Sequence, residues 1–129
     1  MKRISFADVM GVSLGRRAGL IFALISGESG AVLDVIATKL GITDVYPGCK
    51  DKAAALRDFA AKHELGLDQV CFIGDDVNDV AAMGIGGLAV APSGAQPAAR
   101  AAATLVTAAA GGEGCVREVV DMLLAGAQA

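Results

Sequence analysis

The stretch over residues 70–91 constrains the fold of this chain more than any other. Residues 70–73 are apolar and are followed by a glycine, a pattern typical of a short buried strand. Asp75, Asp76 and Asp79 come directly after it. Ligands of open parallel sheets bind beyond the carboxyl ends of the strands. One helix cap would account for only one of these aspartates. Three carboxylates at this position therefore predict a site for a hard cation such as Mg²⁺.

Apolar runs alternate with helix-like patterns along the whole chain. Strands are expected at residues 20–25, 42–46, 70–73, 87–91 and 104–106. Helices are expected at residues 10–19, 31–40, 50–64, 96–102 and 116–125, and residues 1–9 are expected to be extended. This alternation predicts an α/β fold: a three-layer, Rossmann-like sandwich around a parallel sheet, in one domain over residues 1–129.

Composition and charge exclude several classes of protein. The formal net charge of −3 gives no basic patch for nucleic acid, and no apolar run is long enough to span a bilayer. The N-terminal residues lack the apolar stretch of a signal peptide. The three cysteines are widely spaced, which is typical of reduced cytosolic thiols. We therefore expect a cytoplasmic protein that binds neither nucleic acid nor membrane, and a surface role for His63, the single histidine.

Further polar residues are expected at the same rim of the sheet as the aspartates. Ser26 and Gly27 follow the strand at residues 20–25, and Lys52 opens the long helix at residues 50–64. A hydroxyl with backbone N–H groups at a helix N-terminus can bind phosphate, and a lysine adds a positive charge. Taken singly, Ser26 is explained as a helix cap and Lys52 as a solvated lysine. Together with a cation site they predict phosphoryl chemistry.

This order of motifs resembles the haloacid dehalogenase superfamily of phosphotransferases over nearly the whole chain. Within the superfamily it is most similar to the small capless branch, which includes 3-deoxy-D-manno-octulosonate 8-phosphate phosphatases and the related domain of sialic-acid cytidylyltransferases. The matching stretches are residues 8–12, 17–19, 24–27, 40–42, 50–52, 73–79, 86–90 and 111–118. The resemblance implies an α/β sandwich with no cap domain.

The resemblance also implies roles for individual residues. It assigns phosphate binding to Ser26, Gly27 and Lys52, catalysis to Lys52, and Mg²⁺ binding to Asp75, with Asp79 and Asp76 in support. The implied substrate is a small phosphorylated sugar acid, and the implied assembly is a homo-oligomer, a tetramer. Glu28 and Glu113 depart from the family, because they stand where it often carries arginine.

The family's nucleophile motif, an Asp-x-Asp pair at the end of the first strand, is not found. In one alignment, residues 8–12 are a degenerate form of it, with Asp8 as the nucleophile and Met10 in place of the acid/base. Methionine cannot transfer a proton. In the other, Asp8 matches a later aspartate, and the chain is N-terminally incomplete relative to the family and lacks the first strand. The spacing from Asp8 to Ser26 favours the second alignment.

Two functions remain open at this point. The motif set predicts an Mg²⁺-dependent phosphatase. The missing Asp-x-Asp pair and the two glutamates instead favour a non-catalytic pseudophosphatase or oligomerisation domain. A two-component receiver domain also carries aspartates on a parallel sheet, but its acidic pair is expected near the N-terminus, far from Asp75 and Asp76.

Overall fold

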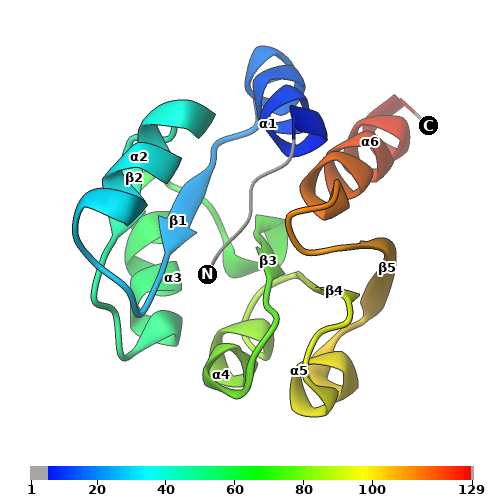
Figure 1. Cartoon of the computed structure of the whole chain (residues 1–129). Coiled ribbons are helices and arrows are strands. Elements are labelled where there is room, and N and C mark those ends of the chain that lie inside the picture. The colour runs from blue at the N-terminus through cyan, green and yellow to red at the C-terminus, as the bar shows by residue number, and fades with distance from the viewer. Residues whose placement is uncertain (1–5, 129) are drawn as a thin grey trace.

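The computed structural model describes residues 6–128, which form short parallel strands connected by helices (Figure 1). The strands are β1 (Ala23–Ile25), β2 (Asp44–Tyr46), β3 (Cys71–Ile73), β4 (Leu88–Ser93) and β5 (Leu105–Ala110). The α-helices are α1 (Phe6–Arg17), α2 (Ala31–Leu40), α3 (Lys52–Lys62), α4 (Val80–Met83), α5 (Pro97–Ala102) and α6 (Cys115–Gln128). Two 3₁₀ turns are η1 (Leu67–Gln69) and η2 (Val77–Asp79).

The strands lie between two layers of helices. Helices α1 and α6 pack together on one side, and α4 and α5 cover the other (Figure 1). Strand β1 pairs in parallel with β2, and β3, β4 and β5 pair in parallel in that order. The predicted α/β sandwich around parallel strands is therefore confirmed. Its loops at residues 26–30, 74–79 and 111–114 all follow carboxyl ends of strands.

The parallel sheet is interrupted between β1 and β3. Within residues 6–128, β1 has only β2 as a strand partner, and β3 has only β4 on its side of the break. Each of the two strands therefore turns one edge toward the interruption without a ladder partner in the described part of the chain. Residues 1–5, most of the segment predicted as extended, lie outside the described residues.

Several element boundaries differ from those predicted. Residues 6–9 are the first turn of α1 rather than an extended segment, and the Asp8 carboxylate accepts backbone hydrogen bonds from α6 and the residues before it. Strand β1 begins only at Ala23, and Ile21 is 48% exposed, because this part of the sheet has a single neighbour. Strand β5 continues to Ala110, where Glu118 binds the N–H groups of two of its last residues.

The core is built mainly from small apolar side chains. It lies under α4 and α5 and consists of Leu56, Ala60, Val70, Phe72, Ala82, Met83, Ala89, Ala91, Ala95 and Ala99. The many alanines let the helices lie close to the strands, which explains how a chain with 4% aromatic residues fills its interior. Within residues 6–128, no helix has the length and hydrophobicity needed to cross a membrane.

Gly87 lies where two segments of backbone approach each other, so Gly87→Ala is expected to lower the free energy of unfolding by about 2 kcal/mol. An added Cβ would lie 2.5 Å from the carbonyl carbon of Asp68, and backbone there cannot move as a side chain can. Gly84→Ala is the matched control, because its Cβ would meet nothing closer than 3.6 Å. Urea unfolding of both variants tests this. Equal stability of the two variants would contradict the close approach of the Asp68 backbone to Gly87.

Candidate active site

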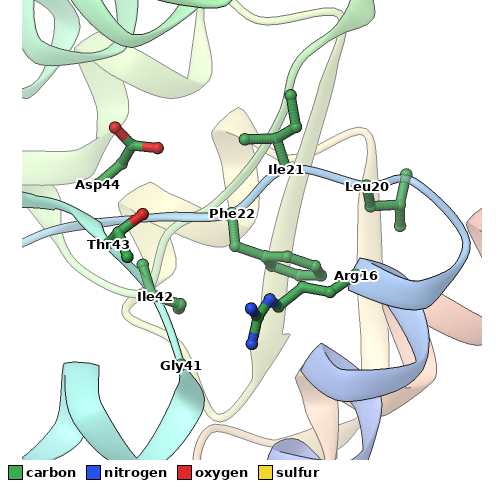
Figure 2. A pocket seen from close by; sticks show the side chains of 8 residues that line it. All are labelled: Arg16, Leu20, Ile21, Phe22, Gly41, Ile42, Thr43 and Asp44. Atoms are coloured by element: carbon green, nitrogen blue, oxygen red, sulfur yellow. The ribbon is translucent and has the colours of Figure 1, made fainter.

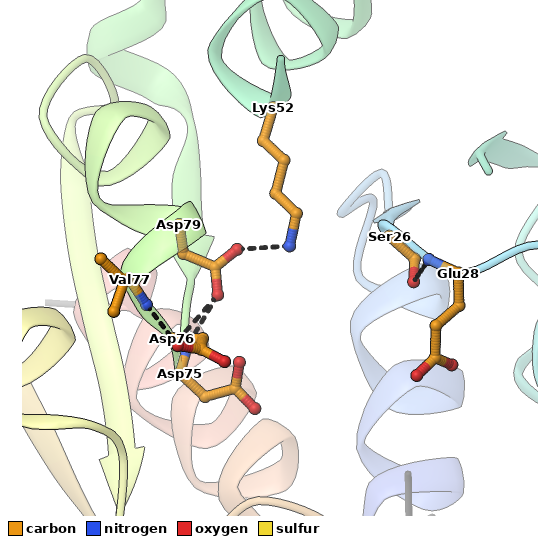
Figure 3. Close-up of polar contacts among 7 residues, drawn as sticks. All are labelled: Ser26, Glu28, Lys52, Asp75, Asp76, Val77 and Asp79. Atoms are coloured by element: carbon orange, nitrogen blue, oxygen red, sulfur yellow. Dashed lines mark hydrogen bonds and ion pairs between the residues drawn. The ribbon is translucent and has the colours of Figure 1, made fainter. Parts of the chain in front are cut away.

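The ion pair between Lys52 and Asp79 joins two rim segments that are far apart in sequence. Lys52 is the first residue of α3, and its Nζ lies 2.7 Å from Oδ1 of Asp79 (Figure 3). The two side chains are only 8% and 5% exposed. A buried lysine and a buried carboxylate are stable in a protein interior only when they are paired. Lys52 and Asp79, both predicted at one rim of the sheet, are therefore in contact.

Asp79 also organises the loop that carries the other aspartates. Its Oδ2 accepts hydrogen bonds from the backbone N–H groups of Asp75, at 2.9 Å, and Asp76, at 3.1 Å. Burial on its own raises the pKa of the Asp79 carboxyl, but the hydrogen bond from Lys52 and those from the two N–H groups outweigh burial and hold this pKa below its usual range. Asp79 is therefore ionised at neutral pH and holds both Lys52 and the loop in place.

The three aspartates do different work in the structure. Asp76 is the N-cap of η2, and its Oδ1 accepts from the N–H of Val77 at 2.6 Å. Asp75 keeps an exposed side chain at the rim, while its backbone carbonyl accepts from the N–H of Gln96 at 2.9 Å. Both the cap and the rim carboxylate expected from the sequence are thus found, on different residues. Gln96 had no sequence signal, because it contributes only backbone.

Ser26 lies at the carboxyl end of β1 and is 1% exposed. Its Oγ accepts from the N–H of Glu28 at 3.0 Å, and its carbonyl accepts from the N–H of Cys49 at 2.7 Å. The second bond ties Ser26 to the loop that leads into Lys52. The N-cap of α2 is Gly30, with no side-chain cap, so Ser26 is not the helix cap that the simpler interpretation suggested. In Figure 3, Ser26 lies across from Lys52 and the aspartates.

Asp8 contacts a different part of the molecule. Its carboxylate is buried and accepts from the backbone N–H of Val116 at 3.1 Å and of Gly114 at 3.4 Å. A negative charge at this end of α6 is favourable, because the N–H groups of the first helical turn carry partial positive charge. This contact agrees with the alignment in which Asp8 matches a later aspartate of the family rather than the nucleophile.

The chemistry of the rim fits a magnesium ion. Among the described residues, no group of three or more histidine, cysteine or acidic side chains is placed to hold a metal. Mg²⁺, however, usually keeps several waters and takes only one or two protein carboxylates together with phosphate oxygens. Asp75 is the best placed ligand, because its side chain is exposed at the rim. Both oxygens of Asp79 already accept hydrogen bonds, from Lys52 and from the backbone of the loop.

A second polar cluster lies at the opposite end of β2 and was not predicted. The buried Asp44 carboxylate is bound by Lys62, and its Oδ2 lies 2.9 Å from Nε2 of His63. His63 therefore pairs with a buried carboxylate at the end of α3 rather than lying free in solvent. An aspartate at the start of an apolar strand was the only signal in the sequence that could have indicated this cluster.

The Asp44 cluster is expected to make the stability of the protein depend on pH in the acid range. The hydrogen bond from Lys62 holds the pKa of Asp44 below its usual 3.8 against the effect of burial, and His63 adds to this. Because the pKa is lower in the folded state, the stabilisation is present above the unfolded value and is lost as pH falls through the folded value. The free energy of unfolding, measured with urea from neutral pH to about pH 3, should therefore fall more steeply for the wild type than for Asp44→Asn. Parallel curves would contradict this.

Comparison with known proteins identifies the family. A family model described as haloacid dehalogenase-like hydrolase matches residues 19–119. The chain belongs to the haloacid dehalogenase-like hydrolases. The range of the match contains Ser26, Lys52 and the three rim aspartates, whereas Asp8 lies outside it. The resemblance inferred from the order of the motifs is therefore confirmed.

Within the haloacid dehalogenase-like hydrolases, the chain is similar to phosphatases that act on a sugar-acid phosphate. The chain is 36% identical to the 3-deoxy-D-manno-octulosonate 8-phosphate phosphatase of Yersinia pestis over 124 residues, which cover 96% of this chain and 66% of that protein. The Escherichia coli K12 enzyme of the same name is 34% identical over the same coverage. The chain thus spans slightly less than two thirds of the length of these relatives.

A solved structure in the same group matches the fold closely. The 3-deoxy-D-manno-octulosonate 8-phosphate phosphatase of Moraxella catarrhalis, crystallised with magnesium, phosphate and the sugar acid KDO, superposes with a TM-score of 0.91 at 32% identity. The match covers 97% of this chain and 72% of that one. The arrangement of helices and parallel strands described above is therefore that of a haloacid dehalogenase-like hydrolase.

Proposed function

We propose that the protein is an Mg²⁺-dependent phosphatase of small phosphorylated sugar acids. The observation that carries this proposal is the buried Lys52–Asp79 pair, which places a lysine and an acidic loop on one rim beside the end of β1. The names of the Yersinia and Moraxella relatives support the substrate class. By the family resemblance, the protein would act in the cytoplasm as a homo-tetramer, and size-exclusion chromatography would test the assembly.

The described residues suit the binding of a phosphoryl group. The Lys52 ammonium is fixed by Asp79 and would offset negative charge on the phosphoryl oxygens. The Ser26 hydroxyl and the backbone N–H of Gly27 would bind the same group from the end of β1. Asp75 would hold Mg²⁺, which when bound neutralises charge on the phosphoryl group during transfer. These residues thus account for binding and charge stabilisation, the larger part of phosphoryl-transfer catalysis.

The proposal also needs a nucleophile, and residues 1–129 contain no Asp-x-Asp pair. We infer that the nucleophile is carried by an extended segment between β1 and β3, where both open edges would pair with it. The carboxyl end of such a strand would reach the rim that holds Ser26 and Asp75 if it runs parallel to β1 and β3, as the strands within each described ladder run parallel to one another. The non-catalytic alternative needs no such segment, and Glu28, close to the phosphate site, is compatible with it.

Hydrolysis of p-nitrophenyl phosphate tests the proposal. Two proteins would be assayed with Mg²⁺ and with a chelator: the 129-residue chain, and the same chain extended at its N-terminus by a strand that carries an Asp-x-Asp pair. We expect turnover from the extended chain and loss of turnover with the chelator. Turnover should also be lost when the first aspartate of the added pair is replaced by asparagine. If the extended chain binds Mg²⁺ and phosphate without turnover, the result would favour the pseudophosphatase.

A further inference from the structure

A polar pocket lies at the edge of the molecule opposite the phosphate rim. It has a volume of about 190 Å³ and opens where β1 and β2 begin, whereas Ser26 follows the end of β1 (Figure 2). Its walls come from the end of α1, the residues leading into β1, and the segment between α2 and β2. Pockets for drug-sized ligands have volumes of about 300–1,000 Å³, so this pocket suits a ligand that is smaller than a typical drug.

Arg16 supplies the charge of this pocket. Its side chain is exposed, and it has no hydrogen-bond or ion-pair partner among residues 6–128. The guanidinium lies directly against Gly41, where any Cβ would clash with it. The ring of Phe22, beside Arg16 in Figure 2, lies against Gly15 in the same way, with 2.7 Å between its Cζ and an added Cβ. Two glycines therefore leave the space in which an arginine and an aromatic ring line one cavity.

The charges around the pocket leave Arg16 in excess. Asp44 is on the opposite wall, but its carboxylate is buried and already paired with Lys62 and His63. With one lysine against one aspartate, the Arg16 charge is not neutralised by the groups described at this edge. The remaining wall is partly apolar and open, since Ile21 is 48% exposed.

We propose that this pocket is a second ligand site, for a small organic carboxylate. The guanidinium fork matches the two oxygens of a carboxylate, and such charge-assisted pairs are stronger than neutral hydrogen bonds. The apolar body of the ligand would lie against the ring of Phe22, which lies beside Arg16 in Figure 2, and the exposed Thr43 is within the same lining. The site is separate from the phosphate rim and does not depend on the proposed phosphatase activity.

Titration of the full chain with benzoate, followed by amide chemical shifts, tests this site. We expect shifts at Phe22, Thr43 and Asp44, and Arg16→Gln should weaken binding about tenfold or more, since the charged pair of hydrogen bonds to the carboxylate is lost. Arg17→Gln is the matched control, because the neighbouring Arg17 donates instead to Ser13 on α1 and should leave benzoate binding unchanged.

Two further measurements complete the test. Benzamide has the same ring without the charge and should bind much more weakly than benzoate. Unchanged circular dichroism of Arg16→Gln would show that it folds, and Arg16→Lys should recover part of the affinity. The proposal is overturned if benzoate shifts only residues around Ser26 and Lys52, or if benzamide binds as well as benzoate. It is also overturned if Arg17→Gln weakens benzoate binding as much as Arg16→Gln does.

Discussion

Lys52→Met is expected to lower the free energy of unfolding by about 3–5 kcal/mol, the cost of breaking a buried ion pair by removing one partner. Methionine fills much of the space of the lysine stem but leaves the Asp79 carboxylate, 5% exposed, without its cation. The two backbone N–H groups that remain bound to Asp79 place the loss toward the lower end of this range. Urea unfolding of the metal-free protein at neutral pH measures it.

The control for this variant is Lys50→Met. Lys50 is exposed two residues earlier and has no ion pair among the described residues, so its replacement should change stability little. The double variant Lys52→Met with Asp79→Asn should regain part of the loss, because the orphaned charge is removed while an amide oxygen can still accept from the N–H groups of Asp75 and Asp76. A loss below about 1 kcal/mol for Lys52→Met would mean that the pair behaves like an exposed one.

Asp75→Asn is expected to weaken Mg²⁺ binding at least about tenfold, since even supporting residues of metal sites typically contribute that much. The carboxylate of Asp75 is exposed at the rim and is the proposed direct ligand. Asparagine keeps the shape and the backbone bond to Gln96 but removes the negative charge. Calorimetric titration with Mg²⁺, with and without inorganic phosphate, measures the change.

Asp76→Asn is the control for Asp75→Asn, because it removes the same charge from a neighbouring residue that is not the proposed direct ligand. Asp76 caps η2 through the N–H of Val77, and asparagine is an equally good cap, so the fold should be preserved. We expect Asp76→Asn to reduce Mg²⁺ affinity much less than Asp75→Asn. Equal losses in both variants would indicate a general effect of charge in the loop and would contradict a specific role of Asp75.

The rim could be predicted from the sequence because each of its parts has a local signal. The apolar run before Asp75 ends in a glycine, and the polar turn at Ser26 follows a second apolar run. Parallel strands then bring these ends to one edge without further information. The division of labour between Asp75, Asp76 and Asp79 could not be predicted, because it depends on which oxygen each backbone N–H reaches.

Features that depend on packing across the chain had no comparable signal. The spacing from Asp8 to Ser26 favoured one alignment of Asp8, but only the structure shows its contact with α6, more than a hundred residues away. The same is true of Asp44, whose partners lie at the end of α3. The start of β1 was predicted too early, because an apolar run normally indicates a buried strand, and here the neighbour that would bury it is not among the described residues.

The interruption of the sheet divides the described chain into two units, each with its own ladder. One contains β1 and β2, and the other contains β3, β4 and β5. Backbone bonds within a sheet normally make its strands open together, but no ladder bond joins these two units within residues 6–128. Side-chain links such as the Lys52–Asp79 pair must then transmit cooperativity between them. A ligand bound at the rim would touch both units, and its binding energy would act as a cross-link that makes them unfold as one.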